Sequence, residues 1–263
     1  MRNRSARARD GGFPYLGEDI AFPFPPPSSA DSRGIVCAGG NLSPGFLLSA
    51  YEQGLFPWYG EGDPILWWSP DPRFVLLPEE LHVSGTMRKL MRRAKFELAL
   101  DRDFASVIRA CSSSPRPGQD GTWIGPDMIE AYVELHRLGY AHSVEARMGG
   151  ELVGGLYGVS LGSVFFGESM FSRVDDASKA AFIPLVWRLR EEGFTLVDSQ
   201  VYTEHLAGLG AREIPRLEYL RLLAGRLEGG RHSAATRKGD WSTLFAGFPD
   251  SAEYRRVVRR EGD

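Results

Sequence analysis

The sequence of 263 residues has no apolar segment long enough to cross a membrane. Its longest apolar run, residues 180–187, falls far short of the roughly 20 residues that a spanning helix needs. The basic N-terminus is followed by Asp10, glycines and prolines instead of the apolar region of a signal peptide. With only Cys37 and Cys111, at most one disulfide can form, so we expect a cytoplasmic protein rather than a disulfide-stapled secreted one.

An excess of charge of one sign is also missing. The chain has 31 basic and 34 acidic residues, a formal net charge of −3, which argues against an evenly basic nucleic-acid coat protein. Hydrophobic residues make up 43% and charged residues 25%, which excludes a wholly disordered chain and a collagen-like repeat. A total near zero still allows local patches of charge.

Several catalytic motifs are absent as well. There is no P-loop for ATP, because none of the four lysines follows a glycine (Lys89, Lys95, Lys179 and Lys238). No G-x-G-x-x-G lies between a strand and a helix, and the Q-x-x-G-x-G/A loop with which acetyltransferases hold coenzyme A is missing. The five histidines lack zinc-ligand spacing and there is no C-x-x-C, so we expect no metal site.

Residues 158–162, GVSLG, match the G-x-S-x-G pattern of a hydrolase nucleophile elbow. Such an elbow requires a strand, a sharp turn and then a helix. Here the serine lies between two predicted strands, so Leu161-Gly162 is interpreted as a hairpin turn and the match as accidental.

Caps and apolar spacing predict one helix that begins near Ser43 and stops at Gly54, and another from Pro126 to before Gly139. Further helices are expected over 84–93, 178–192 and 217–227, and strands over 141–147, 151–159, 163–168 and 195–200. Three antiparallel strands followed by a crossover helix favour an α/β (α+β) sheet domain of the acetyltransferase type.

A polar set lies at or near the C-terminal ends of predicted strands: Glu168, Asp198 and Gln200. In open α/β sheets such ends line the ligand crevice, which makes these residues candidates for catalysis. Other interpretations stay open. Glu168 could be an exposed carboxylate or a partner of Arg173, and Asp198 could cap a turn.

Two features are typical of nucleic-acid binding. Arg88, Lys89, Arg92, Arg93 and Lys95 place five cations within eight residues, a stripe that suits a phosphate backbone. A solvated helix face would show the same pattern. Trp58 and Trp123 lie beside glycine and proline in loops, where a ring could stack on a base, although packing is the alternative.

Longer motifs resemble the bacterial leucyl/phenylalanyl-tRNA–protein transferases, in family order between about residues 13 and 226. The resemblance is specific because a run such as WWSPDPR does not arise by chance. The matching segments are 54–58 (GLFPW), 64–73 (PILWWSPDPR), 122–124 (TWI), 141–145 (AHSVE), 152–158 (LVGGLYG), 167–173 (GESMFSR), 177–179 (ASK), 198–200 (DSQ) and 209–211 (LGA).

The resemblance implies an aminoacyltransferase. It would move leucine or phenylalanine, and methionine less well, from aminoacyl-tRNA to proteins that begin with arginine or lysine, marking them for N-end rule degradation. It would act in the cytoplasm as a monomer, without metal, ATP or other cofactor.

The resemblance also implies a small N-terminal domain and a larger acetyltransferase-like (GNAT-like) mixed-sheet domain. Two prolines at residues 70 and 72 place the boundary between them. We expect a basic disordered tail (1–12), the small domain (13–72), the catalytic domain (73–229) and a loosely attached C-terminal tail (230–263).

Site roles follow from the same resemblance. Asp198 and Gln200 would form the reaction centre, with Glu168 binding the aminoacyl end or the acceptor, while Trp58 and Trp123 would meet the 3′-terminal adenosine. Other groups complete the implied site: an apolar pocket of Leu156, Phe165, Met170 and Val197, and a tRNA-backbone contact of Arg88, Lys89, Arg92 and Arg93.

One departure concerns residues 198–200, where the family often has D-C-Q and this chain has DSQ. The middle side chain of a strand points away from its neighbours, so serine need not disturb the pair and excludes a thiol mechanism there. Two alternatives remain at this stage: an acyl-CoA N-acyltransferase and an RNA-binding module without activity.

Overall fold

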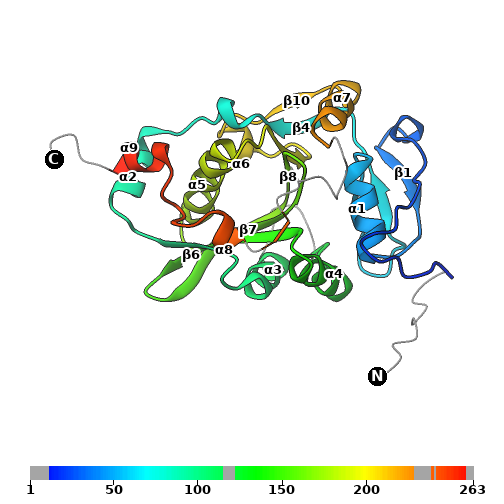
Figure 1. The fold of residues 1–263 in the computed structure, drawn as a ribbon, viewed down its shortest axis with the longest axis horizontal. Helices are drawn as coiled ribbons and strands as arrows, with labels where there is room; N and C mark the ends of the chain where they lie inside the picture. The colour runs from blue at the N-terminus through cyan, green and yellow to red at the C-terminus, as the bar shows by residue number, and fades with distance from the viewer. Residues whose placement is uncertain (1–11, 115–121, 228–237, 240, 259–263) are drawn as a thin grey trace.

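Within the described residues, 12–114, 122–227, 238–239 and 241–258, the computed structural model has a seven-stranded sheet with the order β10-β4-β9-β8-β7-β6-β5 (Figure 1). Neighbouring strands are antiparallel except β8 and β9, which are parallel and joined by a crossover helix. The strands are β4 (Arg73–Leu76), β5 (Glu97–Leu100), β6 (Ala141–Met148), β7 (Glu151–Leu161), β8 (Val164–Ser172), β9 (Leu196–Gln200) and β10 (Arg212–Ile214).

Helices cover both faces of this sheet. The crossover helix α5 (Ala177–Glu191) lies on one face, and α3 (Phe104–Ser113) and α4 (Pro126–Arg137) lie on the other (Figure 1). Strand residues are therefore apolar on both sides, and the buried side chains form one cluster on each face. Sheet side chains near the centre are shielded from water from either direction.

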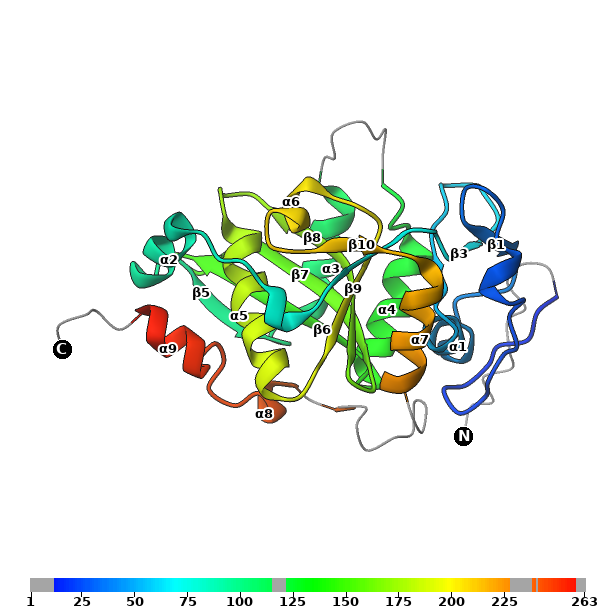
Figure 2. The ribbon, with the colours of Figure 1, turned by 90° about the horizontal axis from the view of Figure 1, so that it is seen from above.

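The N-terminal part packs beside α4 at one end of the sheet (Figure 2). It holds helix α1 (Pro44–Glu52) and a small sheet of order β1-β3-β2, with β1 (Ile35–Ala38), β2 (Phe56–Pro57) and β3 (Leu66–Trp68). Pro44 occupies the first turn of α1, and Gly54 (φ 79°) lies just beyond its end, as the sequence predicts.

The remaining helices are short and lie around the rim. They are the 3₁₀ helices η1 (Pro27–Ser29) and η2 (Pro78–Glu80), and α2 (Gly85–Arg92), α6 (Glu204–Ala207), α7 (Arg216–Arg226), α8 (Trp241–Leu244) and α9 (Ala252–Val258). None of the helices in the described parts of the chain is both long and apolar enough to cross a membrane.

The predicted helices and the predicted strands of the meander are present, with ends within a few residues. Sequence reasoning did not identify β4, β5, β10 or α3. Three of these are strands of three or four residues, too short for a period to be recognised. Ser160 of the GVSLG match is buried inside β7 rather than between two strands, and the turn to β8 is at Gly162-Ser163. A second strand follows that turn instead of a helix, so the segment is a hairpin and not a nucleophile elbow.

The expectation of a loosely attached C-terminal tail is wrong for the described residues beyond 240. Trp241 is fully buried and Val257 is 3% exposed. Both join the apolar cluster on the α5 face, where burial of their surface offsets the entropy lost on ordering the segment. The predicted basic tail at residues 1–12 lies, except for Gly12, outside the described residues.

Candidate active site

A cavity of about 920 Å³ opens where β8 and β9 stop pairing. The two strands are hydrogen-bonded only between residues 164–166 and 196–198, and the cavity is lined by the segments that follow. Eight of the residues predicted from the sequence as catalytic, stacking or pocket residues line it: Trp58, Trp123, Leu156, Phe165, Glu168, Met170, Val197 and Gln200. The structure therefore brings together residues that lie up to 142 positions apart in the chain (200 − 58).

Glu168 reaches this cavity because of a β-bulge. In the β7–β8 ladder, Gly158 pairs with Gly167 and Tyr157 pairs with Ser169, which leaves Glu168 without a partner residue in β7. A bulge of this kind bends the strand and changes the direction of a side chain. Here it turns the carboxyl group of Glu168 towards α1 and α4.

Three neutral donors hold that carboxyl group. The hydroxyl of Tyr51 donates to Oε1 (2.8 Å), the hydroxyl of Tyr132 to Oε2 (3.0 Å), and Nε2 of Gln200 to Oε1 (2.9 Å). Burial raises the pKa of Glu168 to about 7, and the charge of Asp198 acts in the same direction, while the three hydrogen bonds oppose them. Glu168 can therefore gain or lose a proton near neutral pH.

The hydroxyls of Tyr51 and Tyr132 also contact each other. These two hydroxyls and the carboxyl group of Glu168 make three mutual contacts, but the hydroxyls carry only two protons between them. Burial raises the pKa of both tyrosines well above the usual value, so neither can lose its proton near pH 7. A proton on Glu168 would satisfy the third contact, in agreement with its raised pKa.

Asp198 lies behind the cavity rather than in its wall. Its carboxylate is fully buried and accepts two hydrogen bonds from Arg73, from Nε to Oδ1 (2.9 Å) and from Nη2 to Oδ2 (2.6 Å). The hydroxyl of Tyr219 donates to Oδ2 (2.8 Å). Burial is the largest single influence and would lower the pKa of Arg73, but the charge and hydrogen bonds of Asp198, with the charges of Tyr219 and Glu168, together outweigh it, so the pKa is raised and the arginine stays charged.

Gln200 connects the two carboxyl groups. Its backbone N–H donates to Oδ1 of Asp198 (3.0 Å), and its side-chain amide donates to Glu168. Gln200 has a left-handed conformation (φ 61°), which is strained for a residue with a side chain and costs about 1–3 kcal/mol. Asp198 thus acts on the site through the backbone of Gln200, which places it as a positioning residue.

Sequence reasoning did not identify Tyr51, Tyr132, Arg73 or Tyr219. Both tyrosines lie in helices that the sequence predicts, and both are buried. A buried tyrosine needs a partner for its hydroxyl, and that requirement was an available signal. Likewise, Arg73 opens the apolar segment RFVL, where a charge needs a buried counter-charge.

Trp58 and Trp123 lie on the rim of the cavity and are partly buried. Trp58 follows β2, and its carbonyl oxygen accepts a hydrogen bond from Nε1 of Trp68 (2.6 Å). The rings of Trp58 and Trp68 are 5.3 Å apart between centroids. This contact fixes Trp58 beside the cavity, so its position is not that of a core tryptophan.

The four predicted tRNA-backbone residues lie on or at the end of α2, at the other end of the sheet from the N-terminal part (Figure 2). All four are exposed, and none forms an ion pair with a carboxylate in the described part of the chain: Arg88, Lys89, Arg92 and Arg93. Lys95 does not extend this helix, because the chain leaves helical geometry at Ala94 (φ 45°).

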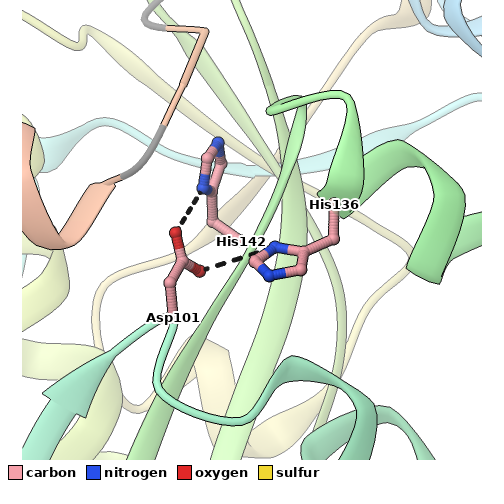
Figure 3. Close-up of side chains that lie close together, drawn as sticks. All are labelled: Asp101, His136 and His142. Atoms are coloured by element: carbon pink, nitrogen blue, oxygen red, sulfur yellow. Dashed lines mark hydrogen bonds and ion pairs between the residues drawn. The ribbon is translucent and has the colours of Figure 1, made fainter.

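The spacing of histidines in the sequence did not reveal one group of potential metal ligands. Asp101, from the turn between β5 and α3, lies between His136 of α4 and His142 of β6 (Figure 3). Nδ1 of His142 is 2.8 Å from Oδ2 of Asp101, and Nδ1 of His136 is 2.8 Å from the carbonyl oxygen of Ala141. Both Nδ1 atoms therefore already have a hydrogen-bond partner, whereas Nε2 of His142 is buried and forms no hydrogen bond within the described residues.

The cavity in this mixed sheet places a carboxyl and an amide group beside apolar walls, which are groups that an acyltransferase can use. Family models match both parts of the chain, that of the leucyl/phenylalanyl-tRNA protein transferase N-terminal domain over residues 40–71 and that of the leucyl/phenylalanyl-tRNA protein transferase over residues 75–224. The chain belongs to the leucyl/phenylalanyl-tRNA–protein transferase family.

Relatives match nearly their whole length. The leucyl/phenylalanyl-tRNA–protein transferase of Myxococcus xanthus is 55% identical over 226 residues, 86% of this chain and 94% of that protein. The protein of the same name from Syntrophus aciditrophicus is 55% identical over 238 residues, 90% of this chain and 95% of its own. These matches confirm the predicted family and enzyme class, and with the sheet topology they confirm the fold class.

Similarity to solved structures is weaker. A GCN5-related N-acetyltransferase from Kribbella flavida aligns with a TM-score of 0.33 and 15% identity, over 65% of this chain and 61% of that one. The structure of L-PGS from Bacillus licheniformis aligns with a TM-score of 0.36 and 15% identity, over 52% of this chain and 49% of that one. Neither alignment is close enough to inform the site.

Proposed function

We propose that the protein transfers leucine or phenylalanine, and methionine less well, from aminoacyl-tRNA to the N-terminal arginine or lysine of acceptor proteins. The added residue then marks the acceptor for N-end rule degradation. Relatives more than 50% identical carry the name of this activity. The single structural observation that supports it most is the contact of Gln200 with Glu168 at the wall of an apolar cavity.

The reaction needs no covalent enzyme intermediate, because an aminoacyl ester is already activated. The α-amine of the acceptor attacks the ester carbonyl carbon, a C–N bond forms, the bond from that carbon to the tRNA 3′ oxygen breaks, and one amine proton ends on that oxygen. The site must hold the amine in its neutral form close to the carbonyl and stabilise developing charge. Gln200 and Glu168 offer a carbonyl oxygen and a carboxyl group for these tasks.

The roles of the two carboxyl groups differ in this proposal. Glu168, with a pKa of about 7, orients the amine and exchanges protons with it, while Asp198 fixes Gln200 through its backbone N–H. Gln200 and Glu168 form the proposed reaction centre, and Asp198 is the residue that positions Gln200. The proton counting at Tyr51 and Tyr132 supports Glu168 as the group whose charge changes.

The apolar side chain of the aminoacyl group would occupy the part of the cavity lined by Leu156, Phe165, Met170 and Val197. Such a pocket rejects charged side chains, because burying an unpaired charge is costly. It separates apolar side chains by only about 1–3 kcal/mol per methylene, which is consistent with accepting more than one of them.

Trp58 and Trp123 would stack on the 3′-terminal adenosine at the cavity rim.

The four cations of α2 would contact tRNA phosphates without reading sequence. If so, changing both Arg92 and Arg93 to alanine weakens the binding of aminoacyl-tRNA. The slope of log K against log salt concentration should then correspond to about two fewer released counterions. An unchanged salt dependence would show that the helix is only a solvated face.

We further propose a monomer in the cytoplasm, with division of the chain after residue 72 and no metal or cofactor. The matched N-terminal family domain, residues 40–71, supports that boundary. The small number of cysteines supports the location. Leucyl- or phenylalanyl-tRNA and a protein with N-terminal arginine or lysine are the required partners.

The direct test uses purified protein, leucyl-tRNA and a peptide that begins with arginine. Transfer of radiolabelled leucine to that peptide is the expected result, and the same peptide with an acetylated N-terminus should accept none because its amine is blocked. No transfer under conditions where the Myxococcus xanthus relative is active would contradict the proposal.

A further inference from the structure

The C-terminal segment inserts an aromatic ring behind the cavity. Trp241, the first residue of α8, is fully buried although it follows a stretch with no regular structure in the described residues 238–239. Its indole ring is stacked on His142 of β6, with centroids 3.9 Å apart and planes 6° apart. It also meets Phe165 of β8 at 5.8 Å between centroids.

Phe165 separates this indole from the cavity. Its side chain is 1% exposed, yet it is part of the cavity lining. On the strand side the ring lies against Gly158, where a Cβ atom would be only 2.5 Å from the ring. The ring of Phe165 therefore has β7 on one side and Trp241 on another, and its distance from the cavity depends on both.

The partner beneath Trp241 is itself held in place. Nδ1 of His142 donates to Oδ2 of Asp101 (2.8 Å), and Oδ1 of Asp101 accepts the backbone N–H of Ser143 (2.8 Å) (Figure 3). His142 lies opposite Gly158 in the β6–β7 ladder. Asp101, His142 and Trp241 thus form a continuous support from the β5–α3 turn to the back of Phe165.

We propose that Trp241 is a positioning residue which holds Phe165 at the cavity wall, so that the C-terminal segment sets the depth of the aminoacyl pocket and the preference between leucine and phenylalanine. This inference rests on the proposed function, because it concerns the same pocket. Close packing explains the effect: a side chain kept in one position by its neighbours moves when a neighbour is removed. Without the indole, the ring of Phe165 can move back and the pocket becomes deeper.

The experiment compares kcat/KM for phenylalanyl-tRNA and leucyl-tRNA in the wild type, Trp241→Leu and Trp241→Phe. A deeper pocket favours the larger side chain, so the ratio of phenylalanine to leucine transfer should rise by about fivefold or more in Trp241→Leu. Trp241→Phe retains a ring behind Phe165, so its ratio should stay close to that of the wild type. An unchanged ratio in Trp241→Leu would overturn the proposal.

The matched control is Val257→Ala, which removes buried apolar volume from α9 of the same C-terminal segment. Helix α9 packs against α2 and α5, so this change loosens the segment without a direct contact with Phe165. The kcat/KM values for phenylalanyl-tRNA and leucyl-tRNA should change by the same factor in Val257→Ala, so the ratio of the two should stay constant. A shift of the ratio in Val257→Ala as large as that in Trp241→Leu would indicate general loosening instead and would also overturn the proposal.

Failure of this inference differs from failure of the proposed function. A wild type that transfers neither amino acid contradicts the function itself. A wild type that transfers both, with one ratio shared by all variants, contradicts only the role of Trp241. If Trp241→Leu does not fold, Trp241→His supplies a smaller ring in the same stack, and the ratio should rise by a smaller factor, about twofold.

Discussion

Gln200 contacts two buried carboxyl groups, and these differ in the charge of their hydrogen-bond donors. The carboxylate of Asp198 accepts two hydrogen bonds from the guanidinium group of Arg73. Glu168 faces only neutral donors, two phenols and an amide. Only Asp198 therefore has a cationic partner, while burial and the charge of Asp198 raise the pKa of Glu168 to about 7 against the effect of its three hydrogen bonds.

This difference separates a structural task from a chemical one. The buried ion pair of Asp198 with Arg73 can hold Gln200 in place, because Asp198 also accepts the backbone N–H of Gln200. A carboxyl group with a pKa of about 7 can instead respond to an amine that must lose a proton. Four variants test the comparison, in order of the expected size of their effect.

Arg73→Leu should lower the free energy of unfolding by about 3–5 kcal/mol, because it leaves the buried charge of Asp198 without a partner. Urea denaturation at pH 7 measures this loss. Arg33→Ala is the matched control, since it breaks an exposed pair with Asp31 and should cost about 0–1 kcal/mol. The double variant of Arg73→Leu with Asp198→Asn should regain part of the stability, and no recovery would mean that the pair is not the source of the loss.

Gln200→Gly should reduce kcat about 10²–10³-fold while the protein stays folded, because it removes the amide but keeps a residue that accepts the left-handed conformation. Single-turnover transfer from leucyl-tRNA measures the loss. Ser199→Gly, one residue earlier, changes the same strand end without removing that amide, and its kcat should fall far less. A defect of Gln200→Gly in KM alone would place Gln200 in binding rather than in the reaction centre.

Glu168→Gln should change how stability depends on pH. Because the folded-state pKa is raised from 4.5 to about 7, the wild type binds one more proton folded than unfolded in this interval, and its stability falls as pH rises through it. Relative to Glu168→Gln, the wild type should lose about 2–3 kcal/mol between pH 4.5 and pH 7 and nothing further above pH 8. Urea denaturation at several pH values checks this, and parallel pH curves for both proteins would refute a raised pKa.

Tyr132→Phe should have the smallest effect, a loss of about 1 kcal/mol, because it removes one hydrogen bond to Glu168 and keeps the ring. That hydrogen bond lowers the pKa of Glu168, so its loss should raise the pKa further. In this variant, the decrease in stability with rising pH should therefore continue to a higher pH than in the wild type. Tyr59→Phe removes an exposed hydroxyl bonded to Asp127 and is the control, for which the pH dependence should not move.

Much of the site could be predicted from the sequence because each motif carries its own local geometry. The apolar pocket was expected from the family resemblance, and in the structure Leu156, Phe165 and Val197 lie in one buried cluster. The tryptophans were found because a ring in a glycine- and proline-containing loop is unusual. The exposed cations of α2 followed from helical spacing.

Other parts of the site depend on contacts between distant segments. Arg73 and Asp198 are 125 residues apart, and Tyr51 and Glu168 are 117 apart, so no local pattern links them. The bulge at Glu168 interrupts the alternation of side chains along β8. At that residue, counting positions along the strand does not tell on which face of the sheet the side chain lies. Trp241 was misjudged because the polar composition around it suggested a tail.

The sequence by itself determined which helices and meander strands form, the family to which the chain belongs and, through that resemblance, eight of the residues that line the cavity. These follow from periodicity, capping and motif order, which act over a few residues at a time. Only the tertiary structure decided that Asp198 pairs with a buried arginine, which tyrosines surround Glu168 and what supports Phe165 from behind. The side chains that bond to the two carboxyl groups come from residues between 21 and 125 positions away, and the support of Phe165 comes from the C-terminal segment, so these contacts exist only once the chain is folded.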